Sequence, residues 1–364
     1  MAGERSERGH AFDLAVALLL AVLFGALYGL TFQERMLGDG AGLATMYAHG
    51  ESFAHHLLYL PACRLVSVVM AGGDPIAPTR FLSVLAAGLG CSFTWLLTRA
   101  LGAPRPGALA ASLLLGLSPG LWFFGTTVEV HALHFLAVAL AAWGVLVAPW
   151  ERTALALALT CVLFALAFLA HQLVVLLAPG WLLLVHHARA RRAEAFPPRT
   201  LLLVVAPSLA AAVLAALAIS NLARTGSLLF SAEHELGFLA AFQRPWHAGW
   251  MWSDGVLPLL FLIPAAAWAA LKAKSSAAHA LLALILAPIA FLSWWGVPEH
   301  GGYALGHAPF LAALAAFAFP SDIRRAALIA APLVAVQAFA AHATIAAFDT
   351  GWKVEERVAQ VRDL

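Results

Sequence analysis

Asp39 stands between two glycines just after the first long apolar segment of the chain. An ionised carboxylate near hydrocarbon costs free energy unless it is solvated or paired, about +2.5 to +3.5 kcal/mol at the centre of a membrane span. An acid at such a boundary is therefore a candidate site residue. The simpler alternative is a loop aspartate, which turn chemistry favours after a helix. Taken alone, Asp39 fits the simpler alternative of a loop residue better. The case for Asp39 as a site residue is strengthened only by the polar residues that follow it in the sequence.

A second polar stretch opens a predicted helix with Glu129, His131 and His134. The two histidines are three residues apart, so they occupy neighbouring positions on one helical face. The simpler interpretation is a helix start with an acid in its first turn, which the helix dipole favours. Such ionisable groups at one face of a membrane bundle are nevertheless typical of a catalytic or transport cavity.

Several other polar residues interrupt the apolar sequence. They are His55 and His56, Arg64, His171, Arg244, and the group Glu299, His300 and Tyr303. Each residue also has a simpler structural explanation. His171 can be a turn residue between paired spans, the glycines after His300 can simply make a turn, and the arginines can anchor at lipid headgroups.

The composition excludes a water-soluble globule. The chain has 364 residues, of which 62% are hydrophobic and 11% charged, with 12 Trp and 22 Phe. No soluble fold of this size could bury that much apolar surface. The balance of 21 Lys and Arg against 19 Asp and Glu gives no basic field for nucleic acid. The sequence therefore predicts an all-α, polytopic transmembrane bundle.

Eleven segments are apolar and long enough to cross about 30 Å of hydrocarbon. They are residues 11–31, 81–100, 107–125, 130–148, 153–170, 172–188, 200–220, 256–271, 277–295, 303–319 and 326–345. We expect one transmembrane domain over residues 1–345, with interfacial helices in the first outer loop, and a short amphipathic tail over residues 346–364.

The segment 55–71 decides the topology because it is short and poorly apolar for a span. If it does not cross, thirteen of the twenty-one basic residues face the cytoplasm together with the N-terminus, as the positive-inside rule asks. Asp39 then lies on the same outer side as Glu129. If it does cross, the two acids lie on opposite sides, and the charge pattern fits almost as well.

The order of motifs resembles the GT-C superfamily of lipid-linked-sugar glycosyltransferases, in an uncharacterised bacterial branch similar to protein O-mannosyltransferases. The motifs are the acid at Gly38-Asp39, the His-rich segment ending at Leu58-Tyr59, residues 96–99 (LLTR), residues 117–123 (LSPGLWF), residues 128–133 (VEVHAL) and residues 168–172 (FLAHQ). The resemblance covers about residues 10–190. The branch has tyrosine where His131 stands, asparagine where Ala170 stands, and a His-Pro-Pro-Gly-Tyr stretch that lacks its prolines here.

The resemblance implies transfer of a sugar, such as a mannose-like hexose, from a polyprenyl-phosphate carrier to an acceptor hydroxyl at the outer face of a bacterial inner membrane. Asp39 matches the first-loop acid of the superfamily and is expected to be the catalytic base. Glu129 matches the second-loop acid, and we expect it to orient sugar or acceptor together with His131. Arg64, Arg244 and His300 are candidates for the phosphate. The implied partners are membrane lipid, the lipid-linked donor and an acceptor protein, lipid or glycan; no metal site is predicted, and a need for a divalent metal stays open.

Three alternatives remain open. A transporter or flippase would use the same buried acids and histidines, although no repeated halves with broken helices are evident. A metal-dependent hydrolase or oxidase would use Glu129, His131 and His134, but the spacing lacks the His-Glu-x-x-His pattern. The third alternative is a catalytically silent member of the glycosyltransferase fold.

Overall fold

The structure is a computed structural model that describes residues 2–33, 40–50, 56–70, 76–225, 259, 261–272, 275–293 and 300–351. All regular elements within these ranges are helical. In chain order they are α1 (Ala2–Leu30), α2 (Gly40–Ala48), α3 (Tyr59–Ser67), α4 (Ile76–Ala100), α5 (Arg105–Gly116), α6 (Pro119–Gly125), α7 (His131–Val147), α8 (Thr153–Ala170), η1 (Gln172–Leu177), α9 (Ala178–Ala190), α10 (Pro198–Thr200), the π-helix η2 (Leu201–Val205), α11 (Ala206–Thr225), α15 (Leu262–Lys272), α16 (Ser276–Leu292), α17 (His300–Ala304), α18 (Ala308–Ala315), η6 (Ala316–Ala318) and α19 (Ile323–Gly351).

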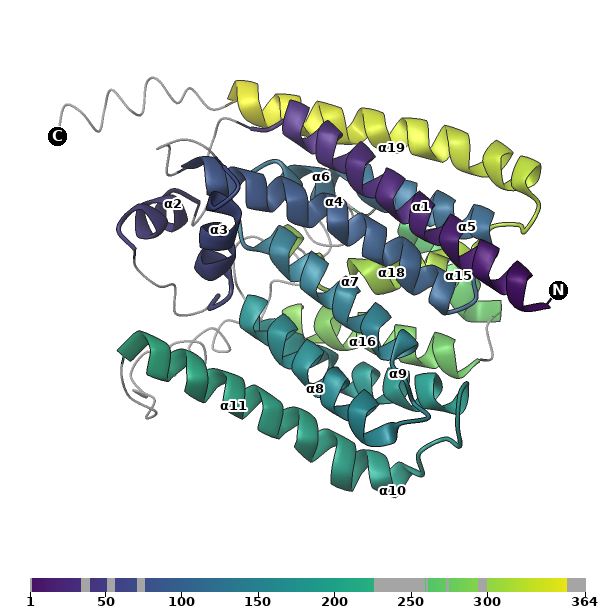
Figure 1. The fold of residues 1–364 in the computed structure, drawn as a ribbon. Coiled ribbons are helices and arrows are strands. Elements are labelled where there is room, and N and C mark those ends of the chain that lie inside the picture. Colours follow the sequence, from purple (N-terminus) through teal and green to yellow (C-terminus); the bar gives the residue numbers. More distant parts are fainter. Residues whose placement is uncertain are drawn as a thin grey trace.

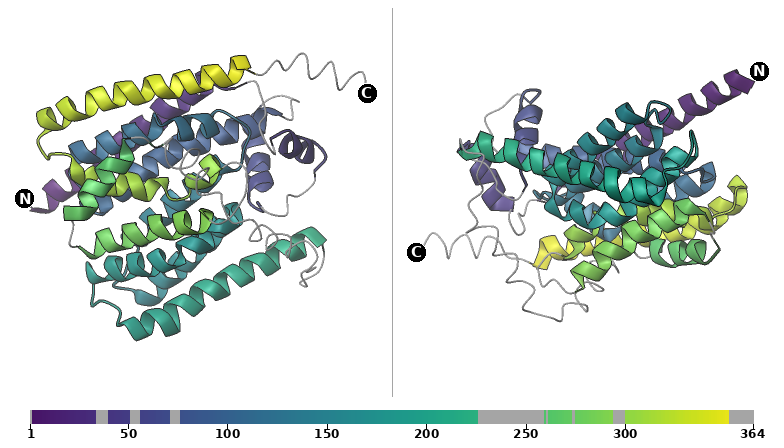
Figure 2. Two further views of the ribbon diagram at one scale, coloured as in Figure 1. Left: turned by 180° about the vertical axis from the view of Figure 1, so that it is seen from behind. Right: turned by 90° about the horizontal axis from the view of Figure 1, so that it is seen from below.

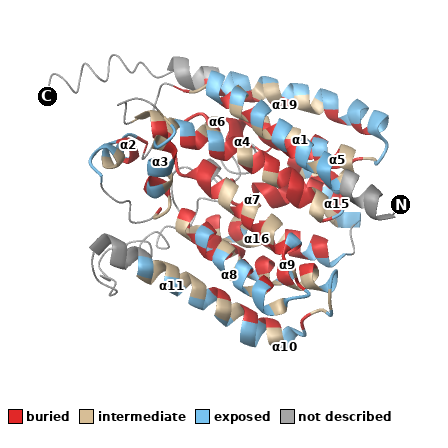
Figure 3. Cartoon of the chain, in the orientation of Figure 1, coloured by how far each residue is buried: buried red, intermediate tan, exposed pale blue. Residues whose placement is uncertain are grey.

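The long helices run side by side along one common axis, as Figures 1 and 2 show. Helix α4 is the centre of the bundle, since 72% of its most apolar stretch is buried, against 22% for α1 and 11% for the stretch 198–219 that contains α11. Figure 3 shows the same gradient, with buried residues along α4 and α7 and exposed residues on α1, α11 and α19. Many of the exposed residues on these three helices are large and apolar, such as Leu18, Leu214 and Phe339. Those outer faces are the surfaces that lipid covers in a membrane bundle.

Glycines let the neighbours of α4 approach closely. A Cβ at Gly88 would lie 2.9 Å from the carbonyl oxygen of Ala21 in α1. A Cβ at Gly90 would collide with the ring of Phe135 in α7. Small residues at such contacts allow the tight packing that associates helices in membranes.

Six helical stretches among the described residues are long and apolar enough to cross a membrane, and the pair α5 and α6, bent by 59°, makes up to seven. The other apolar helices, α7, α15, α16 and the stretch 308–318, are shorter. Each of the eleven predicted segments overlaps helix within the described residues, but the span count of eleven is not confirmed by length. Helix α3, at nine residues, is only about 14 Å long at 1.5 Å per residue, too short for the hydrocarbon core.

Helices α2 and α3, which fall between α1 and α4 in the sequence, lie together at one end of the bundle in Figure 1. The segment after α1 is tied there to the loop that precedes α7. The backbone N–H of Gln33 donates to Thr126 O at 2.8 Å, and its side-chain Nε2 donates to Thr126 Oγ1 at 2.7 Å. The backbone just after α1 is therefore positioned beside the loop that carries Glu129.

Helix α6 is set at its angle by the Ser118-Pro119 pair. The side chain of Ser118 caps α6 by accepting a hydrogen bond from the backbone N–H of Leu121 at 3.3 Å. Pro119 occupies the first helical turn, where its missing N–H costs no hydrogen bond. The break turns the chain so that residues 126–130 lead directly into α7.

Candidate functional site

Four histidines from distant parts of the chain meet at the end of the bundle that carries α2 and α3. His171, between α8 and η1, lies at their centre. Its ring centroid is 4.4 Å from that of His134, 4.7 Å from His56 and 5.7 Å from His131. All four side chains are buried, with 9% exposure for His56 and 3% or less for the other three. We call these four residues the histidine cluster.

The backbone break at His171 positions the central ring. Helix α8 ends there because the residue adopts an extended conformation (φ −160°, ψ 123°), and its side chain then caps η1. Nδ1 accepts a hydrogen bond from the backbone N–H of Leu173 at 3.2 Å. In the neutral ring the proton must therefore be on Nε2. This buried Nε2 has no hydrogen-bond partner among the described residues.

His56 is positioned by the last turn of α8. Its Nδ1 lies 3.3 Å from the carbonyl oxygen of Ala170, which can only accept, so Nδ1 of this ring carries a proton. The backbone of Leu58 adds a second link by donating to Leu169 O at 3.0 Å. The segment that leads into α3 is thereby fixed against the end of α8.

Helix α17 and the turn after it, from the C-terminal part of the chain, pack against the histidine cluster. The ring of Tyr303 meets His131 edge to face at 4.9 Å and His171 at 5.3 Å. A Cβ at Gly302 would collide with the His131 ring, and one at Gly306 with the His134 ring. The two glycines therefore let backbone pack directly on imidazole. His307 follows in the same turn and is buried.

Glu129 is buried beside the cluster, with 1% exposure. Its Oε2 accepts a hydrogen bond from the backbone N–H of Val130 at 3.3 Å. Ser83 of α4 donates to the Glu129 carbonyl oxygen at 3.4 Å. The carboxylate also acts on Tyr59 at the start of α3: burial, then Cys63, then Glu129 raise the pKa of the Tyr59 hydroxyl well above its ordinary value. α3, α4 and the loop before α7 thus converge on this acid.

The electrostatics of the cluster favour neutral imidazole. Burial lowers the pKa of His171 well below its ordinary value, and the charges of His134, His56 and His131 lower it further. A buried neutral imidazole is a hydrogen-bond donor and acceptor without net charge. The site as it stands is thus a set of oriented polar groups that an anionic ligand could convert to cations.

The predicted site residues divide into three groups. The structure brings together Glu129, His131, His56, His171 and Tyr303. It places Arg64 apart, on the exposed face of α3, where Nη2 donates to the carbonyl oxygen of Gly50 at 2.8 Å. Of His300 it describes the backbone as the first residue of α17, and Asp39, His55, Arg244 and Glu299 lie outside the described residues.

Two buried histidines were absent from the residues predicted to bind the glycosyltransferase substrates. His134 was signalled by its spacing of three residues from His131 but was given a role only in the metal-dependent alternative. His307 was signalled by its place four residues after Tyr303 in the same polar stretch. No group of three or more His, Cys, Asp or Glu side chains in the described part of the chain is arranged to hold a metal ion.

Comparison with known proteins bears on the fold. No protein-family model matches the sequence, and no curated protein is significantly similar to it. ArnT from Cupriavidus metallidurans bound to undecaprenyl phosphate superposes with a TM-score of 0.58 at 16% identity, over 85% of this chain and 59% of ArnT. Its apo form gives 0.56 at 17% identity, over 86% and 60% of the two chains.

A second solved protein shares the arrangement. The oligosaccharyltransferase of Archaeoglobus fulgidus, in complex with zinc and sulfate, superposes with a TM-score of 0.55 at 17% identity, over 92% of this chain and 53% of that one. The chain thus spans less than two thirds of the length of either protein. The helical membrane fold of this chain is therefore similar to the fold of these two proteins.

Proposed function

We propose that this chain is a membrane glycosyltransferase that transfers a sugar from a polyprenyl-phosphate-linked donor to an acceptor hydroxyl. The observation that carries the proposal is the buried polar site around Glu129 and His171 at one end of a bundle that superposes on ArnT bound to undecaprenyl phosphate. The similarity to ArnT supports the class of donor. A mannose-like sugar and a protein acceptor rest on the motif resemblance alone.

The reaction requires few groups from the protein. The acceptor oxygen attacks the anomeric carbon of the sugar, the bond from that carbon to the phosphate oxygen breaks, and the polyprenyl phosphate leaves with the electron pair. The acceptor proton passes to a base. A direct displacement of this kind inverts the anomeric carbon. Since the phosphate is already a competent leaving group, catalysis depends on positioning and on donors near the growing phosphate charge.

Asp39 is the proposed base. The described residues that bracket it, Gln33 and Gly40, lie on the segment between α1 and α4, and Gln33 is hydrogen-bonded to the loop before Glu129. An aspartate of ordinary pKa, near 4, is a weak base for a hydroxyl, so orientation of the acceptor must supply much of the effect. Glu129 and His131 are proposed to orient sugar or acceptor.

The histidine cluster is proposed to serve the phosphate. Nε2–H of His171 is a buried donor without a partner among the described residues, which is the kind of pre-oriented group that stabilises charge as it develops. An approaching phosphate would also favour protonation of the neighbouring imidazoles. The cluster can therefore gain positive charge as the leaving group gains negative charge.

The decisive test is Asp39→Asn, assayed in membranes with radiolabelled polyprenyl-phosphate sugars. We expect at least a hundredfold loss of transfer at unchanged expression, because general bases contribute about 10² to 10⁴-fold. Asp322→Asn is the matched control, since Asp322 is an exposed residue that caps α19 through a hydrogen bond from Arg325 N, and asparagine caps equally well. Unchanged turnover in Asp39→Asn would remove Asp39 from the mechanism.

A further inference from the structure

A polar cavity lies at the opposite end of the bundle from the histidine cluster. Its volume is about 530 Å³. It is framed by the start of α1, the end of α4, the start of α5, the end of α7 and the residues after α9, which Figure 1 places at the end where the N-terminus lies. Nothing in the proposed transfer reaction uses it.

Four arginines line this cavity, against a single carboxylate among its lining residues. They are Arg99, Arg105, Arg191 and Arg192, and the carboxylate is Asp13. With His10 neutral, the lining residues carry a formal charge of +3, four positive minus one negative. Asp13 is shared between two of the arginines, since its Oδ2 lies 3.3 Å from Arg99 Nε and its Oδ1 lies 2.8 Å from Arg105 Nε.

The guanidinium groups are held in place by hydrogen bonds to backbone. Arg105 Nη2 donates to Gly9 O at 2.8 Å. Arg99 and Arg191 donate to the carbonyl oxygens of Ala103 and Ala100, where α4 ends. A guanidinium has five N–H donors, and the described contacts use two on Arg105. Fixed, partly unused donors around a hollow are the arrangement that binds phosphate oxygens in pairs.

One wall of the cavity is apolar. Leu96 of α4 and Trp143, Leu146 and Val147 of α7 form it. These residues belong to the last turns of two apolar helices, so the cavity lies where a bundle meets lipid headgroups. A ligand that fits must therefore present an anionic group to the arginines and an apolar body to the wall.

We propose that this cavity binds the phosphate headgroup of an anionic membrane phospholipid. Basic pockets between transmembrane helices are suited to such headgroups. The positive-inside rule accounts for basic residues at one end of a bundle, but it does not require them to converge. Arg324 and Arg325 at the start of α19 illustrate the difference, because they are exposed and do not line the cavity.

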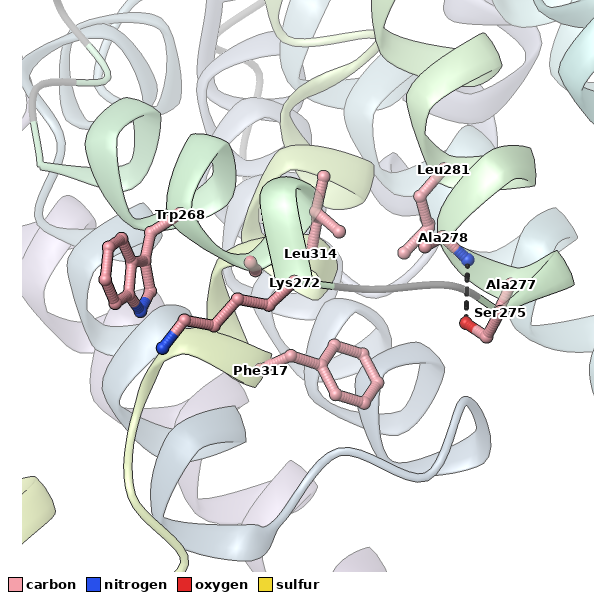
Figure 4. Close-up of a pocket in the computed structure, with 9 residues that line it drawn as sticks. Trp268, Lys272, Ser275, Ala277, Ala278, Leu281, Leu314 and Phe317 are labelled. Atoms are coloured by element: carbon pink, nitrogen blue, oxygen red, sulfur yellow. Dashed lines mark hydrogen bonds between the residues drawn. The ribbon is translucent and has the colours of Figure 1, made fainter.

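A smaller cavity among the described helices provides a contrast. It measures about 210 Å³, between α15, α16 and α18 (Figure 4). Its one cation, Lys272, extends toward Trp268, with Nζ 3.9 Å from the ring centroid. The nearby Ser275 hydroxyl is used as the cap of α16, accepting from Ala278 N at 3.2 Å. The one charged group that lines this smaller cavity is the Lys272 ammonium, which already contacts an aromatic ring. The cavity therefore lacks a set of cationic donors that converge on one point.

The test measures binding of cardiolipin and phosphatidylglycerol to the purified full-length protein by native mass spectrometry. The test variant is Arg191→Gln with Arg192→Gln, which leaves the Asp13 ion pairs intact. We expect affinity to fall about 25-fold, about fivefold for each arginine removed. The matched control, Arg324→Gln with Arg325→Gln, removes the same charge at the start of α19 and should bind like the wild type.

Further measurements make each outcome decisive. Glu151→Gln, which removes the exposed carboxylate 4.0 Å from Arg192, should tighten binding, and a thermal melt of each variant verifies that it is folded. Phosphatidylcholine should not bind. Equal binding by the test variant and the wild type would overturn the proposal. So would displacement of the lipid by millimolar inorganic phosphate, which would identify a site for a soluble anion.

Discussion

The central residue of the site is His171, whose neighbours leave it buried and neutral. Three imidazoles surround its ring within 5.7 Å. A charged His171 would be desolvated and would repel any charge on its neighbours. The arrangement avoids repulsion between charges while the rings are neutral, and it makes the folded state sensitive to acid.

Acid should therefore destabilise the protein through His171. Its pKa is lowered on folding, so the unfolded chain takes up a proton below its ordinary value, about 6.5, while the folded chain does not. Stability is fully present above about pH 6.5 and is lost progressively as the pH falls toward the lower folded-state pKa. Thermal melts in detergent at pH 8 and pH 5 measure this loss.

His171→Gln is the variant for that experiment. It removes the titrating group and should melt with a smaller difference between pH 8 and pH 5 than the wild type. The exposed His342 provides the comparison, and His342→Gln should keep the wild-type difference. If His171→Gln retained the full pH dependence, other groups would be responsible for it.

At the scale of elements, the site depends on backbone that approaches side chains closely. Gly302→Ala places a Cβ against the His131 ring, and such overpacking costs about 1 to 3 kcal/mol. We expect a lower melting temperature and reduced sugar transfer, because α17 must move away from the cluster. Gly42→Ala in α2 is the control, since nothing lies within 4 Å of a Cβ there. Equal activity of the two variants would contradict this role for α17.

The contact between α4 and α7 offers a second test of close packing. Gly90→Ala should destabilise the bundle by about 1 to 3 kcal/mol, because the added methyl collides with the Phe135 ring. Phe135→Leu should relieve part of the clash in the double variant, giving a coupling energy that separate sites would not show. Thermal unfolding of the two single variants and the double variant measures this coupling. Strictly additive effects would argue against the contact.

The sequence predicted much of the fold because hydropathy and helix length act locally. Each predicted apolar segment overlaps helix within the described residues, and the polar stretch from Glu129 to His134 leads into helix α7 at the site. The grouping of His56 with His171, by contrast, depends on where α8 ends and how α3 docks on it. The exposed position of Arg64 likewise depends on the direction of α3. His56 and His171 are more than a hundred positions apart, and no local pattern encodes their contact.

For the whole molecule, the bundle separates two polar ends along one axis. The histidine cluster lies at the end that carries α2 and α3, and the arginine-lined cavity lies at the end of the N-terminus (Figure 1). The positive-inside rule predicts that the arginine end faces the cytoplasm. The proposed transfer site would then face outward, as the proposed reaction at the outer face of the membrane requires.

This orientation can be tested with single cysteines in a background that lacks Cys63, Cys91 and Cys161. Gly42→Cys in α2 and Ser321→Cys before α19 are both exposed positions, and they lie at opposite ends of the bundle. An impermeant maleimide applied to intact cells should label only Gly42→Cys, whereas both should label after permeabilisation. The reverse pattern would place the histidine cluster inside the cell, where an outer-face transfer from a polyprenyl-phosphate sugar is impossible, and the proposed function would have to be abandoned.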